Sequence, residues 1–192
     1  MNKIALVIGG TGGIGSVIVK LLSKNNIKIY ATYYHNERVK KIKQSENFKL
    51  IQCDIRKDES IEKVINQIID NDSKIDILIN TVASRLKLRP FEKLTYDEFF
   101  NDLEIMLLGT VKLFKHIIPL MKKNKSGIII NFLSAAINNP PARMSSYITA
   151  KYGLLGLMKS LYAEIKPFNI NIYGISPSFV ETDLIKNFPK KF

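Results

Sequence analysis

The chain has 192 residues, of which 46% are hydrophobic and 24% are charged. These proportions are typical of a folded globular protein and exclude extended disorder. The formal net charge is +12, but no basic cluster is interleaved with aromatic residues, so we expect no nucleic-acid partner.

The length fits one domain, and no linker rich in proline, glycine or serine divides it. We therefore expect a single domain over residues 1–192. The first apolar run, Ile4 to Ile8, ends at glycines and is too short for a signal-peptide core or a membrane span. This predicts that the protein does not associate with a membrane and that its location is cytoplasmic.

Cysteine and histidine, which commonly bind zinc, are few. Cys53 is the only cysteine, which excludes an internal disulfide and a thiolate zinc cluster. His35 and His116 are far apart in the sequence, and neither has a cysteine or a carboxylate at ligand spacing. We predict no metal site.

A glycine-rich turn follows the first predicted strand. Residues 3–8 form a continuous apolar run typical of a strand buried on both faces of a parallel sheet, and residues 16–22 have a helical pattern. Between them, the spacing G-x-x-x-G-x-G puts Gly9 at the tight turn, Gly13 where backbone approaches a pyrophosphate, and Gly15 where helix packs on strand. The free N–H groups and the dipole at a helix N-terminus favour phosphate. The sequence therefore predicts a dinucleotide-binding turn.

The end of the second predicted strand, residues 27–33, is where such a domain reads the adenosine ribose. An Asp or Glu there would accept hydrogen bonds from the ribose hydroxyls and repel a 2′-phosphate. Tyr33 and Tyr34 occupy this region instead, and Arg38 is the first clear cation after them. The sequence therefore favours NADP(H) over NAD(H).

Strands and helices alternate along the rest of the chain. Further strands are predicted over residues 48–53, 75–80, 127–133 and 169–175, and further helices over residues 38–44, 60–70, 95–121 and 144–166. The helix over residues 95–121 opens with a capping box at Thr95 and Glu98. Regular alternation predicts a doubly wound parallel sheet with helices on both faces, the three-layer α/β/α Rossmann fold. The basic loop over residues 85–90 either shapes a substrate entrance or is a solvated loop.

The helix predicted over residues 144–166 carries Tyr147 and Lys151. They are four residues apart, so their side chains lie on one face. Because a nearby cation favours the phenolate, we expect Lys151 to lower the pKa of Tyr147. Ser134 closes the strand predicted over residues 127–133, at the kind of strand end where sites in open α/β sheets collect. The three residues together indicate a proton-donor site.

These features together resemble the short-chain dehydrogenase/reductase family over essentially the whole chain. The glycines of the opening turn match the family's cofactor loop, and Asp54 matches the acid that contacts adenine. Asn80 matches the first asparagine of the family's Asn-Asn-Ala-Gly stretch, which here is Asn80-Thr81-Val82-Ala83. Pro177 and Thr182 match the Pro-Gly-x-x-x-Thr segment that cradles the nicotinamide.

The resemblance implies an NAD(P)H-dependent oxidoreductase that interconverts a carbonyl and an alcohol, and the chain is most similar to the 3-oxoacyl-acyl carrier protein reductases. Its substrate would be a small carbonyl compound, an alcohol or an acyl thioester, and the protein would be a homo-oligomer, either a dimer or a tetramer. Ser134 would donate a hydrogen bond to the carbonyl oxygen, Tyr147 would deliver the proton, and Lys151 would also bind the nicotinamide ribose. The residues implied to contact the cofactor are Gly9, Thr11, Gly12, Gly13, Ile14, Gly15, Tyr34, Asp54, Ile55, Asn80, Tyr147, Lys151, Pro177 and Thr182.

The chain departs from the family pattern in three ways. Met106 stands where the family has an asparagine that holds a water beside the lysine, and Asp102, one helical turn earlier, is a candidate to replace it. Ala83 and Ser178 replace family glycines. The sequence also lacks the family's substrate-covering region and its last strand, so either the site is open or the sequence is a fragment. A dinucleotide-binding sensor with weakened or lost catalysis is the alternative function, and a nucleic-acid binder ranks last.

Overall fold

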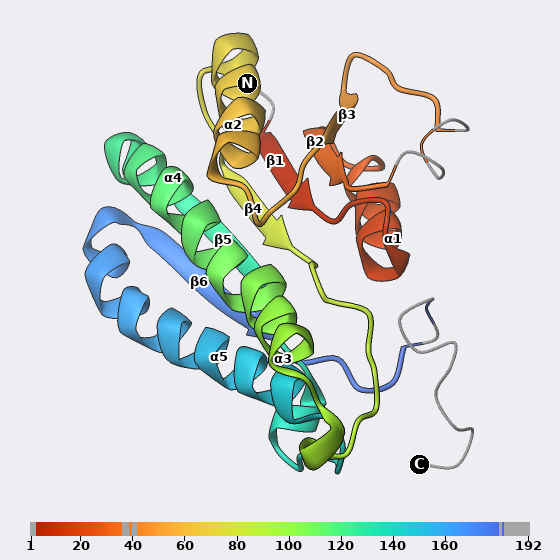
Figure 1. Cartoon of the computed structure of the whole chain (residues 1–192). Coiled ribbons are helices and arrows are strands. Elements are labelled where there is room, and N and C mark those ends of the chain that lie inside the picture. The colour runs from red at the N-terminus through yellow and green to blue at the C-terminus, as the bar shows by residue number, and fades with distance from the viewer. Residues whose placement is uncertain (1–2, 36–38, 40–41, 181, 183–192) are drawn as a thin grey trace.

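The computed structural model describes residues 3–35, 39, 42–180 and 182. Within this part of the chain, six parallel strands form one sheet in the order β3-β2-β1-β4-β5-β6 (Figure 1). The strands are β1 (Lys3–Ile8), β2 (Ile27–Tyr33), β3 (Phe48–Gln52), β4 (Ile77–Asn80), β5 (Gly127–Phe132) and β6 (Ile170–Ile175). The strand order reverses between β1 and β4, which confirms the doubly wound topology and places the crevice for a ligand at the carboxyl ends of these strands.

Helices cover both faces of the sheet, so the molecule has three layers. The helices are α1 (Gly13–Leu22), α2 (Asp58–Asp72), α3 (Tyr96–Leu103), α4 (Gly109–Asn124) and α5 (Ser145–Ile165). Short helical turns are η2 (Phe91–Lys93), the π segment η3 (Glu104–Leu108), η4 (Ala135–Ile137) and η5 (Lys166–Phe168). In Figure 1, α4 and α5 run side by side along the sheet, while α1 lies apart from them near β2.

Two hydrophobic clusters lie on the two faces of the sheet because side chains alternate along each strand. Leu6 of β1 belongs to the cluster shared with α2, α4 and α5. Its neighbours Ala5 and Val7 point the other way, into the cluster that contains α1 residues such as Val19. Strands buried on both sides need apolar residues at every position, which is why the sequence of β1 is an uninterrupted apolar run.

The helix expected over residues 95–121 is interrupted. It begins with the predicted capping box, in which Thr95 accepts from the Glu98 amide at 3.2 Å and Glu98 accepts from the Thr95 amide at 3.4 Å. A π turn then spans Glu104–Leu108, and the Gly109 amide donates to the Glu104 carbonyl, five residues back. An apolar pattern does not reveal a π turn, since such turns depend on tertiary contacts and often occur at functional sites.

The other elements lie within a few residues of their predicted bounds, with one exception. Residues 38, 40 and 41 of the basic helix expected over residues 38–44 lie outside the described residues. Residues 39 and 42–44, which the structure describes, are not helical. Within the described part of the chain, no helix is both long enough and apolar enough to cross a membrane.

Candidate active site

A cavity of about 560 Å³ lies at the carboxyl ends of β1, β4, β5 and β6. Four segments that follow these strands build its wall: the glycine turn after β1, the loop from Thr81 after β4, the turn that starts at Ser134, and the segment from Pro177 after β6. Helix α5 supplies Tyr147 and Lys151. Because the strands are parallel, their carboxyl ends meet at one edge, and this brings together residues that are more than 100 positions apart.

The glycine turn has the geometry that its spacing predicts. Gly9 has a φ of 76°, a conformation that side chains disfavour, and its carbonyl accepts from the Gly12 amide at 2.9 Å. A Cβ on Gly15 would lie 2.2 Å from the Gly9 carbonyl oxygen, so only glycine fits where α1 packs on the turn. Helix α1 begins with no side-chain cap and no acid in its first turn, which leaves its amide groups available to a phosphate.

Thr182 folds back onto this turn. A Cβ on Gly13 would lie 2.3 Å from the Thr182 methyl carbon, so Thr182 packs against the start of α1. Thr182, Pro177 and the four residues Gly12, Gly13, Ile14 and Gly15 all line the cavity, as does Ser178, which replaces a family glycine. Gly9 and Thr11 belong to the same turn but are not among the cavity-lining residues.

Ser134 has its hydroxyl oriented by its own backbone. Its Oγ accepts a hydrogen bond from the Ala136 amide at 3.2 Å, as the N-cap of the short turn Ala135–Ile137. A hydroxyl that accepts one bond in this way still has its proton to donate. The interaction with the Ser134 side chain lowers the pKa of Tyr147.

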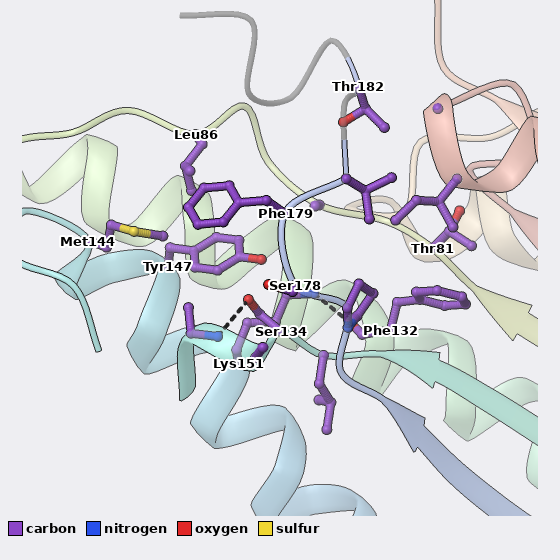
Figure 2. A pocket seen from close by; sticks show the side chains of 18 of the residues that line it. Thr81, Leu86, Phe132, Ser134, Met144, Tyr147, Lys151, Ser178, Phe179 and Thr182 are labelled. Atoms are coloured by element: carbon purple, nitrogen blue, oxygen red, sulfur yellow. Dashed lines mark hydrogen bonds between the residues drawn. The ribbon is translucent and has the colours of Figure 1, made fainter. Parts of the chain in front are cut away.

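Tyr147 and Lys151 face the same cavity from one side of α5 (Figure 2). Lys151 is only 1% exposed, and its Nζ donates to the Phe132 carbonyl oxygen at 2.7 Å. An ammonium group has three donors, and this carbonyl is the acceptor that the described residues supply. Lys151 can therefore offer donors to a polar group, such as ribose hydroxyls, bound in the cavity.

The expectation that Lys151 lowers the pKa of Tyr147 is wrong for this structure. Burial raises the pKa of Tyr147, and the charge of Asp102 raises it further, while the bond from Ser134 opposes both. Burial also lowers the pKa of Lys151 to about 8. The lysine ammonium lies 5.8 Å from the centroid of the tyrosine ring and is bonded to a carbonyl, so the group that lowers the phenol pKa is Ser134.

Met106 lies in the π segment and is 1% exposed. Ser84 donates a hydrogen bond to its sulfur at 3.8 Å, and the Thr110 hydroxyl donates to its carbonyl at 2.7 Å. Asp102, the candidate to replace the missing asparagine, accepts a hydrogen bond from the Ser146 hydroxyl at 2.5 Å. The Asp102 carboxylate is thus bonded to the residue next to Tyr147.

Tyr34 and Asp54, which the resemblance implies to contact the cofactor, do not line the cavity and are joined to each other by Arg56. Both carboxylate oxygens of Asp54 accept from Arg56, at 2.9 and 2.8 Å, and this pair holds the pKa of Asp54 below its ordinary value. Arg56 also donates to the Tyr34 hydroxyl at 2.6 Å and lies 5.2 Å from the centroid of its ring. Arg56 therefore links the residues that follow β2 and β3, and its guanidinium lies between Tyr34 and Asp54.

Asn80 and Ile55, two further residues implied to contact the cofactor, do not line the cavity and contact other parts of the protein. The Asn80 side chain donates to Thr110 at 2.9 Å and to Asn131 at 2.8 Å, and its oxygen accepts from the Val82 amide. It is 2% exposed and ties β4 to β5 and α4. Ile55 is buried against Gly109, where an added Cβ would lie 3.0 Å from its side chain and its carbonyl oxygen.

Several cavity residues were not predicted as site residues. Leu86, Met144 and Phe179 line the cavity with Tyr147 (Figure 2), and Leu86 shows that the loop over residues 85–90 contributes to its wall. The alternation in that loop could have indicated this, since leucines alternate with basic residues there. No sequence pattern pointed to Arg56, because its contact with Tyr34 joins residues that are 22 positions apart.

Among the described residues, no three His, Cys, Asp or Glu side chains gather where they could hold a metal ion. The donors around the cavity are instead suited to an organic ligand with phosphate and hydroxyl groups. The unblocked amides at the start of α1 suit the phosphates, and the Lys151 ammonium suits the hydroxyls. The site therefore fits a nicotinamide dinucleotide.

Comparisons with known proteins agree with this geometry. The family model for short chain dehydrogenase matches residues 3–191. The 3-oxoacyl-[acyl-carrier-protein] reductase of Vibrio cholerae serotype O1 is 30% identical over 187 residues, which is 96% of this chain and 76% of that protein.

Two solved structures share the fold. The 3-ketoacyl-(acyl-carrier-protein) reductase from Brucella melitensis complexed with NADH has a TM-score of 0.92 at 22% identity, over 97% of this chain and 79% of that one. The protein ElxO with NADP bound has a TM-score of 0.91 at 24% identity, over 97% of this chain and 77% of that one. The fold, the arrangement of the cavity and the match over residues 3–191 lead to one conclusion: the chain belongs to the short chain dehydrogenase family of oxidoreductases.

Proposed function

We propose that the protein uses NADP(H) to interconvert a small-molecule carbonyl and its alcohol, with a 3-oxoacyl thioester as the leading candidate substrate. The observation that carries the proposal is the meeting of Ser134, Tyr147 and Lys151 in one cavity that also reaches the glycine turn. A hydroxyl, a phenol and an ammonium at one wall are the groups needed to bind a carbonyl oxygen and protonate it.

A bound nicotinamide supplies the hydride, and the chain's residues supply orientation and the proton. Ser134 donates a hydrogen bond to the carbonyl oxygen of the substrate. Tyr147 transfers its phenolic proton to that oxygen as negative charge develops there. Lys151 holds the ribose hydroxyls with the donors that the Phe132 carbonyl leaves available. These roles remain proposals.

The preference for NADP(H) rests on the end of β2. Neither Tyr33 nor Tyr34 is acidic, so these two positions do not repel a 2′-phosphate. Arg56, which is paired with Asp54 and bonded to the Tyr34 hydroxyl, puts a guanidinium at the same place. An arginine near the ribose is the usual partner of a 2′-phosphate.

The thioester substrate is supported by the Vibrio cholerae relative, whose name describes reduction of a 3-oxoacyl group on a carrier protein. The apolar side chains of Leu86, Met144 and Phe179 around the cavity suit an acyl chain. A cytoplasmic location, a homo-oligomer and a single domain over residues 1–192 stay predictions.

The alternative is a dinucleotide sensor with weakened catalysis. Met106 favours it, because a thioether bonded to Ser84 stands where the family has an asparagine. Calorimetric titration with NADPH and NADH, run beside a turnover assay on ketones and 3-oxoacyl thioesters, separates the two functions. We expect binding of NADPH and turnover of a carbonyl. Binding without turnover on any carbonyl would favour the sensor, and no binding of either cofactor would contradict both.

A further inference from the structure

Tyr152 follows Lys151 on α5 and makes an unexpected contact. Its side chain is 48% exposed, so water could satisfy its hydroxyl. The hydroxyl instead donates to the backbone carbonyl oxygen of Ile137 at 2.5 Å. This bond joins the helix that carries Tyr147 and Lys151 to a segment that is separate from it.

That segment is the turn that begins at Ser134. Ile137 is the last residue of the three-residue turn Ala135–Ile137, and its amide donates to the Ser134 carbonyl at 3.2 Å. At the other end of the turn, the Ser134 hydroxyl accepts from the Ala136 amide. The direction of the Ser134 hydroxyl is therefore fixed by the turn, and the turn is tied to α5 through Tyr152.

A single 3₁₀ turn has weak hydrogen-bond geometry and few bonds of its own, so external contacts decide where it lies. In this structure the Ala135 amide donates to the Pro177 carbonyl at 2.9 Å, which holds the turn to the segment after β6. The bond from Tyr152 holds it to α5. It is a direct side-chain link between the element that carries Ser134 and the helix that carries Tyr147.

We propose that Tyr152 is a positioning residue that fixes Ser134 relative to Tyr147. Tyr152 does not touch the cavity; it acts through the backbone of the Ser134 turn. Catalytic groups lose much of their effect when they are misplaced by about 1 Å. The kinetic part of this inference rests on the proposed function, whereas the contact itself does not.

The test is a cycle of Tyr152→Phe, Ser134→Ala and the double variant, assayed with NADPH and a ketone. The phenylalanine keeps the ring and removes only the donor. We expect Tyr152→Phe to lower kcat about tenfold, the factor that corresponds to one net hydrogen bond, with the KM for NADPH unchanged. In the Ser134→Ala background the same change should have no further effect, because the group that it positions is gone.

Tyr162→Phe is the matched control. Tyr162 lies on the same helix, is 40% exposed, and its ring packs near the Lys166 ammonium, away from the turn. It should retain wild-type kcat. The proposal is overturned if Tyr152→Phe keeps wild-type kcat, or if its loss is equally large with and without the Ser134 hydroxyl.

Hydrogen exchange of the Ala136 and Asn138 amides provides a readout that needs no turnover. Both amides bond within the turn, to Ser134 Oγ and to the Ala135 carbonyl. Tyr152→Phe should speed their exchange about tenfold, while Tyr162→Phe should not. Unchanged exchange overturns the proposal even if kcat falls. If the wild-type protein turns over no carbonyl, the proposed function fails, and the exchange rates alone then decide whether Tyr152 holds the turn.

Discussion

Lys151 donates a hydrogen bond from its buried Nζ to the carbonyl oxygen of Phe132, 2.7 Å away, at the end of β5. A hydrogen bond to one carbonyl offsets only a small part of the free energy that an ammonium group loses when it is removed from water. Burial accordingly lowers the pKa of Lys151 from 10.5 to about 8. The buried lysine thus lowers the stability of the folded protein without cofactor, and such perturbed pKa values are common among residues at functional sites.

The first prediction concerns stability and pH. Between about pH 8 and pH 10.5 the unfolded chain holds the Lys151 proton and the folded chain does not, so this residue makes the free energy of unfolding rise with pH. The lowered pKa corresponds to a penalty of about 3 kcal/mol on the folded state below pH 8. Lys151→Met should remove this pH dependence.

Urea unfolding of wild type and Lys151→Met at pH 7, 8 and 9.5 measures this pH dependence. The free energy of unfolding of wild type should rise relative to that of Lys151→Met as pH rises. Comparing the two proteins at each pH cancels the titration of the other lysines. A constant difference would mean that Lys151 keeps an ordinary pKa.

The second prediction concerns Ser134. Its bond lowers the pKa of Tyr147, so Ser134→Ala should raise that pKa. In alcohol oxidation Tyr147 must accept a proton, and the rising limb of kcat/KM against pH should move to higher pH. The rate should also fall by roughly 10², as expected when a donor to the reacting oxygen is lost. Ser23→Ala, at the end of α1, is the control; a profile for Ser134→Ala with the wild-type limbs would contradict the role.

The third prediction concerns Tyr147 itself. Tyr147→Phe removes the proton donor and keeps the ring, so turnover should fall by roughly 10² or more. The affinity for NADPH, measured by calorimetry, should change little, because the glycine turn and Lys151 remain. Wild-type turnover in this variant would remove Tyr147 from the mechanism.

The fourth prediction concerns the choice of cofactor. Arg56→Gln removes the cation beside Tyr34 and also frees the Asp54 carboxylate, which would then repel a 2′-phosphate. The ratio of the Kd for NADPH to the Kd for NADH should rise tenfold or more, the scale of a lost charge-assisted bond. Arg56→Lys keeps the charge and should lose less. Equal ratios in all three proteins would show that Arg56 does not select the cofactor.

The fifth prediction compares two helical glycines. Alanine is favoured over glycine by about 1 kcal/mol in a helix interior, and a Cβ on Gly156 of α5 would meet no atom within 4 Å. Gly156→Ala should therefore raise the free energy of unfolding by about that amount. Gly15→Ala places a Cβ 2.2 Å from the Gly9 carbonyl and should lower both stability and NADPH affinity. Urea unfolding and calorimetry measure the two effects; equal stability changes would contradict the packing role of Gly15.

The parts of the structure that depend on local pattern were predictable from the sequence. Apolar runs located the strands, the spacing of Gly9, Gly13 and Gly15 located the turn, and the four-residue step from Tyr147 to Lys151 put both at one cavity. Each of these signals is contained within a few neighbouring residues.

The parts that depend on contacts between distant segments were not predictable. The raised pKa of Tyr147 results from burial, which no local pattern reports. The joining of Tyr34 and Arg56 requires two strands to end side by side. The bond from Tyr152 to Ile137 requires a helix to reach a turn 15 positions earlier.

The π segment Glu104–Leu108 also determines which side of α4 faces the sheet. Each residue of an α-helix rotates the chain by about 100°, so the extra residue in the wide turn rotates α4 by about that angle relative to α3. In this orientation Gly109 faces Ile55, where an added Cβ would lie only 3.0 Å from the Ile55 side chain and carbonyl oxygen. Removing one residue from the segment would swing Gly109 away and turn a bulkier neighbour toward the strand end beside Asp54. The local widening of one helix thus determines how closely that helix can approach Ile55 and the strand end beside Asp54.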